Sequence, residues 1–209
     1  MRWIIRTVAV LSVVSWIVVA GLFARPVVSS ETKLPARREP LEAARSLPLD
    51  WSRRVLAGSH DVFAGARREQ ADAVLPIVER YSRRFRLDPL MVLAVIQVES
   101  RFEPDAVSAQ GAIGLMQLQG ATARDLAMDL GLEWTGDDLL LDPDLNVMLG
   151  CAYLRRLMDR FGDQDAALAA YCSGPTLVEA RRGANDRIPL AYSDRVWDVL
   201  TALRGKVSA

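Results

Sequence analysis

The segment from Leu90 to Val98 constrains the fold of this chain more than any other. It is apolar on almost every side of the helix that its residues favour, and Gln97 is its one polar member. A helix that is apolar all round has to be enclosed by other elements. Asp88 and Pro89 precede the segment, and a capping aspartate followed by a first-turn proline is typical of a helix start. The sequence therefore predicts a central, buried helix.

Helix signals continue along the chain, whereas strand patterns are almost absent. Proline and capping residues predict three further helix starts, at Pro76, at the Thr122–Asp125 pair, which resembles a capping box, and at Asp142–Pro143. Apolar periodicity predicts two more helices, over residues 165–171 and 190–203. At most, a small β-hairpin fits within residues 106–113. The expected fold class is therefore all-α.

The first 24 residues have the pattern of an export segment. Arg2 and Arg6 precede an uncharged, mostly apolar run from Thr7 to Ala24, an arrangement that keeps the N-terminus inside. The run is long for the core of a signal peptide and slightly short for a membrane span. A cleaved signal and a retained inner-membrane anchor therefore both stay open, and either one places the remaining chain outside the cytoplasm.

Composition divides the remaining chain into two parts. Residues 25–70 contain four prolines before residue 49, and residues 49–70 have an amphipathic pattern through Trp51 and Phe63. We expect a linker followed by a possible helix in this part. Residues 71–205 carry the dense helix signals, and we expect them to form one folded domain of ordinary size.

Charge and composition exclude several kinds of site. The chain has 26 basic and 26 acidic residues, so its net charge gives no indication of nucleic-acid binding. One histidine, His60, and two cysteines, Cys151 and Cys172, do not supply a histidine-rich metal site or an all-cysteine zinc site. A histidine-based catalytic triad is equally unsupported.

Glu99 is the residue whose sequence context is best suited to catalysis. It follows the apolar segment directly, so its carboxyl group is expected to be partly desolvated and near a helix C-terminus. Both effects favour the protonated form and raise the pKa, as a general acid near neutral pH requires. Taken alone, a glutamate that turns into solvent at a helix end is the simpler interpretation.

Three ordered blocks favour the chemical interpretation. They read ESRF at 99–102 followed by AVS at 106–108, GAIGLMQ at 111–117, and AAY at 169–171 followed by Gly174–Pro175. Together they resemble the soluble lytic transglycosylase family over roughly residues 74–203, and three blocks in order are far more specific than one. The resemblance implies a lysozyme-like helical domain of the goose type.

The resemblance also implies a reaction on the glycan strands of bacterial peptidoglycan. Glu99 would protonate the oxygen of the β-1,4 bond between N-acetylmuramic acid and N-acetylglucosamine. It would then take the proton of the C6 hydroxyl group as that oxygen closes on C1. The product is a 1,6-anhydromuramyl end, formed without water, metal or cofactor. The implied partners are glycan strands of the periplasm, and the inner membrane if the anchor is retained, and no protein partner is indicated.

Five residues match positions at which the family binds substrate: Ser108, Met116, Gln117, Tyr171 and Tyr192. The amide of Gln117 can donate and accept hydrogen bonds to sugar groups. Met116 offers an adaptable apolar surface to a sugar ring, and core packing is its alternative role. We expect Tyr171 to point its hydroxyl group at Glu99, and a core tyrosine with a satisfied hydroxyl group is the alternative.

Two other functions stay open in the sequence. A muramidase on the same fold would admit water, and an inactive glycan-binding or scaffold module would need no acid. Most glycosidases use two carboxylates. Glu103 and Asp105 lie near Glu99 in sequence, although the family reserves no such role for them.

Cys151 and Cys172 are the only cysteines, and Cys172 stands where the family usually has asparagine. In an exported protein the pair predicts a disulfide, which would brace the wall that carries Tyr171. Two thiols that merely pack in the interior are the alternative.

Overall fold

The structure is a computed structural model of the 209-residue chain, and it describes residues 47, 50–58 and 67–208. The expected export segment, residues 1–24, lies outside the described residues, as do most of the expected linker, His60 and Phe63. Among the residues that are described, no helix combines the length and the apolar character needed to cross a bilayer.

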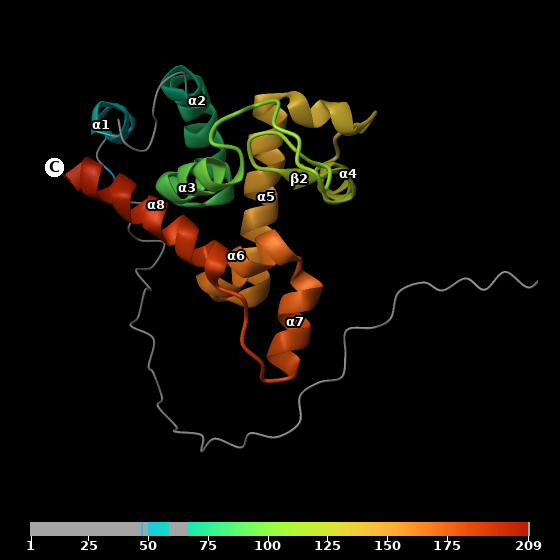
Figure 1. Cartoon of the computed structure of the whole chain (residues 1–209). Helices are drawn as coiled ribbons and strands as arrows, with labels where there is room; N and C mark the ends of the chain where they lie inside the picture. The colour runs from blue at the N-terminus through green and yellow to red at the C-terminus, as the bar shows by residue number, and fades with distance from the viewer. Residues whose placement is uncertain (1–46, 48–49, 59–66, 209) are drawn as a thin grey trace, which may run out of the picture. The chain divides into compact units, whose positions relative to one another are not determined.

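The described part of the chain is built almost entirely of helices (Figure 1). They are α1 (Trp51–Gly58), α2 (Arg67–Phe85), α3 (Pro89–Glu99), α4 (Gly120–Asp129), α5 (Pro143–Phe161), α6 (Gln164–Ser173), α7 (Pro175–Gly183) and α8 (Ala191–Ser208), with a short 3-10 helix, η2, at Asp137–Leu141. Strands β1 (Ala112–Ile113) and β2 (Leu118–Gln119) form one antiparallel pair. The predicted all-α class with at most a small hairpin is confirmed, but the hairpin lies over residues 112–119, and the pairing within residues 106–113 is only an isolated bridge between Val107 and Ile113.

Helix α3 is the central helix that the sequence predicts. Every residue from Pro89 to Ile96 is buried, because α2 and α8 pack along it (Figure 1). The carboxylate of Asp88 caps the helix by accepting a hydrogen bond from the backbone N–H of Leu90 at 2.9 Å. The same carboxylate pairs with Arg204 of α8 at 3.0 Å, so the start of α3 is tied to α8.

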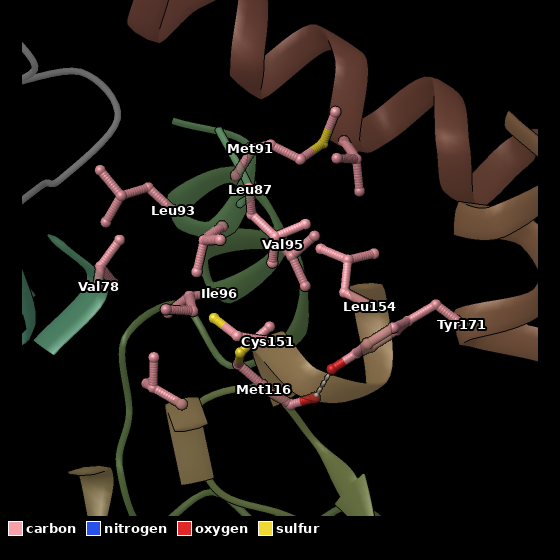
Figure 2. Close-up of a cluster of buried hydrophobic side chains, with 14 of the residues drawn as sticks. Val78, Leu87, Met91, Leu93, Val95, Ile96, Met116, Cys151, Leu154 and Tyr171 are labelled. Carbon is pink, nitrogen blue, oxygen red and sulfur yellow. Dashed lines mark hydrogen bonds between the residues drawn. The ribbon is translucent and has the colours of Figure 1, made fainter. Parts of the chain in front are cut away.

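The hydrophobic core continues from α3 into α5 and α6. Figure 2 shows Val95 and Ile96 of α3 close to Cys151 and Leu154 of α5. All four side chains are fully buried. Close packing of this kind leaves little room for either helix to shift, so the C-terminal end of α3 is held in a defined place.

Helix α2 begins earlier than the sequence predicts. Pro76 lies inside the helix and not in its first turn. Ala71 and Val74 before the proline are buried, as is Val78 after it, so tertiary packing extends the helix across the proline. The domain boundary expected at residue 71 therefore falls within α2.

Helix α1 is also part of the packed core. Trp51 and Val55 are buried, and α1 packs against α8. The guanidinium of Arg54 donates to the backbone oxygen of Val207 at 3.3 Å. The segment that the sequence assigns to a linker and a possible helix thus contributes a helix to the fold.

Two further helix boundaries differ from the sequence predictions. Helix α4 starts at Gly120, directly after β2, and its N-cap residue Gln119 makes no side-chain capping bond. Thr122 therefore lies within the first turn and does not cap the helix. Gly174 ends α6 as expected, but Pro175 also begins α7, because proline is well suited to a first helical turn.

Candidate functional site

Glu99 and Tyr192 form the centre of the candidate site. Glu99 is the last residue of α3, and Tyr192 lies in the first turn of α8. The hydroxyl group of Tyr192 donates a hydrogen bond to Oε1 of Glu99 at 2.6 Å. Tyr192 is buried and Glu99 partly buried, so the packing of α8 on α3 holds this pair in a largely desolvated place.

The pKa of Glu99 is raised above its usual range. Burial is the main cause, because it disfavours the charged form, and it outweighs two opposing effects. The hydrogen bond from Tyr192 and the nearby positive charge of Arg195 both favour the carboxylate. Burial and the charge of Glu99 also raise the pKa of Tyr192 well above its ordinary value, so Tyr192 keeps its proton and remains a donor.

The backbone turns sharply immediately after Glu99. Arg101 and Phe102 have φ values of 54° and 66°, in the left-handed region that costs energy for residues other than glycine. The side chain of Phe102 is fully buried and anchors this turn. Strained backbone of this kind persists only where the surroundings hold it, and it is frequent at functional sites.

Asn146 of α5 fixes the loop of residues 100–119, which joins α3 to α4, and no pattern in the sequence marks Asn146 for this role. Its side chain is 0% exposed. Its carbonyl oxygen accepts from the backbone N–H of Met116 at 2.8 Å, and its amide nitrogen donates to the backbone oxygens of Ile113 and Leu140, both at 2.9 Å. Gly114 makes this approach possible, because a Cβ atom there would collide with the Asn146 side chain.

Met116 does not offer a surface to a ligand, which corrects one expectation. Its side chain is 0% exposed and lies against Gly150, where a Cβ atom would collide with it. A glycine in α5 therefore lets the loop pack directly on the helix. Core packing, the alternative role of Met116, is the one observed.

Tyr171 also differs from the expectation. Its hydroxyl group donates to the backbone oxygen of Met116 at 2.8 Å and not to Glu99 (Figure 2). Its ring stacks on that of Tyr192, with centroids 6.4 Å apart, and contacts the ring of Tyr153 at 5.3 Å. Tyr171 thus joins the loop to a row of aromatic rings beside Glu99.

Gln117 and Ser108 both make hydrogen bonds within the loop. The amide nitrogen of Gln117 donates to the backbone oxygens of Ala106 and Gly114 at 3.0 and 2.9 Å. The hydroxyl oxygen of Ser108 accepts from the backbone N–H of Ala112 at 3.0 Å. The side-chain oxygen of Gln117 has no partner among the described residues, and the Ser108 hydroxyl group keeps its proton for a further acceptor.

Arg195 and Tyr153 also belong to the site, although the sequence patterns assign neither of them a role. The guanidinium of Arg195 lies 5.7 Å from the centroid of the Tyr192 ring. Arg195 follows Tyr192 by three residues, so both lie on one face of α8, which is a signal that helical spacing does contain. Tyr153 carries no such signal, because its place beside Tyr171 depends on how α5 and α6 pack.

The two cysteines are free thiols, so the expected disulfide is not formed. Cys151 is fully buried in α5, whereas Cys172 is exposed near the end of α6. In α6 the run of buried residues extends from Ala166 to Tyr171 and ends before Cys172. The Cys172 thiol therefore lies at the surface, whereas that of Cys151 lies in the core.

No second carboxylate in the described part of the chain contributes to the pKa of Glu99. Asp105 is exposed, and Glu103 is partly buried. Within the same residues, no three histidine, cysteine, aspartate or glutamate side chains gather as metal ligands would. The chemistry that this geometry supports is proton transfer by a single carboxyl group.

Comparisons with known proteins agree with this geometry. The family model of the transglycosylase SLT domain matches residues 76–188, more than half of the chain. A protein of Enterobacteria phage PRD1 named transglycosylase is 37% identical over 124 residues, which are 59% of this chain and 42% of that protein. The membrane-bound lytic murein transglycosylase C of Actinobacillus pleuropneumoniae serotype 5b (strain L20) is 33% identical over 155 residues, with 67% and 42% covered.

A solved structure shares the fold. The 70 kDa soluble lytic transglycosylase of Escherichia coli aligns with a TM-score of 0.52 and 25% identity, over 63% of this chain and 23% of that chain. The match to the phage and Actinobacillus relatives spans 42% of each of their lengths, so this chain corresponds to less than half of either relative.

Proposed function

Because this chain belongs to the transglycosylase SLT family, we propose that it is a peptidoglycan lytic transglycosylase in which Glu99 is both acid and base. The observation that carries the proposal is the partly buried carboxyl group at the end of α3, whose pKa is raised by desolvation. A group of this kind holds a proton at a pH where an exposed glutamate does not.

Glu99 first acts as the acid. It protonates the oxygen of the β-1,4 bond between N-acetylmuramic acid and N-acetylglucosamine, so that the C1–O bond breaks and the N-acetylglucosamine end leaves. The acetamido group of the substrate supports the positive charge that develops at C1. Deprotonated Glu99 is then stabilised by the Tyr192 hydrogen bond and by the positive charge of Arg195.

Glu99 next acts as the base. It takes the proton of the C6 hydroxyl group while the C6 oxygen bonds to C1, which leaves a 1,6-anhydromuramyl end and restores the protonated acid. One carboxyl group is sufficient for these two steps. This agrees with the pKa of Glu99, to which no second carboxylate among the described residues contributes. A hydrolase would instead activate water at the second step.

Substrate binding falls to the polar groups of the loop and of α8. Gln117 has a side-chain oxygen that can accept from an acetamido N–H group, and Ser108 has a hydroxyl proton to donate. Tyr192 contacts the carboxyl group that reacts. The ring of Tyr171 supports this arrangement by stacking on the ring of Tyr192.

The cell envelope is the place in which this reaction would occur. Residues 1–24 have the pattern of an export segment, either a cleaved signal peptide or an inner-membrane anchor. The relative from Actinobacillus pleuropneumoniae is named as membrane-bound, which supports an envelope location. The glycan strands of the periplasm are the substrate that such a location supplies.

Mass spectrometry of the fragments released from purified cell-wall sacculi tests the proposal. A lytic transglycosylase releases muropeptides that are lighter by one water than the products of hydrolysis. Anhydromuramyl ends are the expected result. Reducing muramyl ends would assign the chain to the muramidases, and no release of fragments would favour a glycan-binding module.

A further inference from the structure

We infer that Asp165 is a positioning residue for Glu99, because it fixes the turn of α8 that carries Tyr192. The catalytic role of Glu99 in this inference rests on the proposed function. The contact between Tyr192 and Glu99 does not rest on the proposed function, because the hydrogen bond between them is present in the structure.

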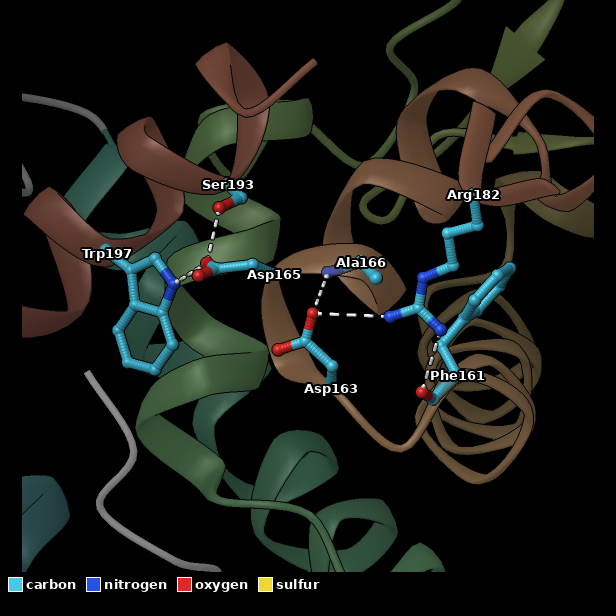
Figure 3. A network of polar contacts seen from close by, with 7 residues as sticks. All are labelled: Phe161, Asp163, Asp165, Ala166, Arg182, Ser193 and Trp197. Atoms are coloured by element: carbon cyan, nitrogen blue, oxygen red, sulfur yellow. Dashed lines mark hydrogen bonds and ion pairs between the residues drawn. The ribbon is translucent and has the colours of Figure 1, made fainter. Parts of the chain in front are cut away.

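Asp165 joins α6 to α8 through a single oxygen atom. Its Oδ1 accepts one hydrogen bond from the hydroxyl group of Ser193 and one from the indole N–H of Trp197, each at 2.7 Å (Figure 3). Ser193 is fully buried and Trp197 almost so. Buried donors need an acceptor, and the Oδ1 atom of Asp165 satisfies both of them.

The first turn of α8 is therefore held on two sides. Ser193 is the neighbour of Tyr192, and successive residues point about 100° apart, so one turn presents Tyr192 to Glu99 and Ser193 to Asp165. Apolar packing of α8 on α3 is non-directional and does not by itself set the direction of a hydroxyl group. Hydrogen bonds to a fixed oxygen are directional, so Asp165 defines the rotation of α8 at which the Tyr192 hydroxyl group reaches Glu99.

The side chains that interact electrostatically with Glu99 come from the two helices that Asp165 connects. Tyr192 and Arg195 of α8 lower the pKa of Glu99, and the charge of Glu99 in turn raises the pKa of Tyr171 and of Cys172 in α6. A change in how α6 and α8 meet therefore changes the surroundings of Glu99 directly. This agrees with a positioning role for a residue at that junction.

Asp163 provides a matched control in the same region of the chain. It caps α6 by accepting from the backbone N–H of Ala166 at 3.3 Å, and it pairs with Arg182 of α7 at 3.4 Å. Figure 3 shows Asp163 directed toward α7 and Asp165 directed toward α8. Loss of Asp163 disturbs the same end of α6 without removing a bond to α8.

The test follows the titration of Glu99 by NMR of protein labelled with ¹³C at the glutamate carboxyl carbons, with Glu99→Gln to identify the signal. We expect Asp165→Ala to raise the pKa of Glu99 in the direction that Tyr192→Phe does, because both weaken a hydrogen bond that favours the carboxylate. Asp165→Asn should stay near wild type, since its amide oxygen can accept both donors. Asp163→Ala should leave the titration unchanged.

A double variant separates positioning from general damage. If Asp165 acts through Tyr192, then Asp165→Ala adds no further shift in a Tyr192→Phe background. An unchanged or lowered pKa in Asp165→Ala, as water entering the site would produce, overturns the inference, and so does an additive shift in the double variant. Should Asp165→Ala fail to fold, Ser193→Ala and Trp197→Phe each remove one of the two bonds and carry the same expectation.

The titration does not require turnover. A wild-type protein that releases nothing from sacculi would contradict the proposed function, and the shift in Asp165→Ala would still support or overturn the role of Asp165. Conversely, an active enzyme in which Asp165→Ala leaves Glu99 unshifted would keep the function and remove the positioning role.

Discussion

The rings of Tyr171 and Tyr192 stack with centroids 6.4 Å apart and planes inclined by 14°, yet their hydroxyl groups have different acceptors. Tyr192 donates to Glu99, and Tyr171 donates to the backbone oxygen of Met116. Replacing either tyrosine by phenylalanine removes a hydroxyl group from one of two neighbouring rings, and a different hydrogen bond is lost in each variant.

Tyr192→Phe should lower turnover by roughly tenfold, since a hydrogen bond to a charged group contributes about 1.5 kcal/mol or more. It should also raise the pKa of Glu99, because the lost bond favours the carboxylate. An acid with a higher pKa stays protonated to higher pH, so the alkaline limb of the pH–rate profile should move upward. Rates measured across pH provide the check.

Tyr171→Phe is the control for that experiment. It removes a buried hydrogen bond to the loop and should lower stability by about 1 kcal/mol. The pH–rate profile should keep its position, because no bond to Glu99 is lost. An equal shift in both variants would show that the stacked rings, and not the Tyr192 hydroxyl group, govern Glu99.

Asn146→Ala should destabilise the fold strongly. It leaves the buried backbone N–H of Met116 and the backbone oxygens of Ile113 and Leu140 without their partner. We expect a loss on the order of 3 kcal/mol in the free energy of unfolding, measured by urea denaturation. The exposed amide of Gln119, with one bond at 3.3 Å, is the matched control, and Gln119→Ala should stay within about 0.5 kcal/mol of wild type.

The two thiols should differ in reactivity. Cys172 is exposed and should react with a thiol reagent in the native protein, whereas Cys151 is buried and should react only after unfolding. Burial raises the pKa of both thiols, so the reaction of Cys172 should accelerate as pH rises. Titration before and after denaturation counts the thiols. If no thiol reacts either in the native protein or after denaturation without a reductant, Cys151 and Cys172 form a disulfide, and the free thiols of the structure are contradicted.

Local signals in the sequence were sufficient for much of the fold. Asp88 and Asp142 cap α3 and α5 through bonds to backbone N–H groups only two and three residues away, so their roles can be read from neighbouring residues. The buried character of α3 follows in the same way from its own composition. The extension of α2 through Pro76 cannot be read from neighbouring residues, because it depends on what packs against both halves of the helix.

The site required tertiary information. Glu99 was predicted from the apolar segment and the ordered blocks, but 93 residues separate it from Tyr192, and no local pattern decides between Tyr192 and Tyr171 as its donor. The same holds for Asn146, whose three bonds reach a distant loop. Cys151 and Cys172 were paired by counting, whereas the directions of their side chains decide the outcome.

Glu99 should also make stability depend on pH. Burial raises its pKa in the folded protein, so the folded state binds the proton more tightly than the unfolded chain does. Stability is then highest below the unfolded-state pKa and falls as pH rises through the folded-state pKa. Glu99→Gln removes this titration, so it should be more stable than wild type at neutral pH, by a margin that shrinks as pH falls through the folded-state pKa of Glu99 and no longer changes below the unfolded-state pKa of about 4.3. Thermal unfolding across pH measures the margin, and a margin that does not change with pH would argue against a buried acid.

The most direct test of the account is the release of fragments from purified sacculi by Glu99→Gln. Glutamine keeps the shape of the side chain and can accept from Tyr192, but it cannot transfer a proton. General acid and base catalysis contributes on the order of 100- to 10,000-fold, so we predict that turnover falls by at least that lower bound while Glu103→Gln remains active. If Glu99→Gln keeps more than about a tenth of wild-type turnover, Glu99 is not the catalyst.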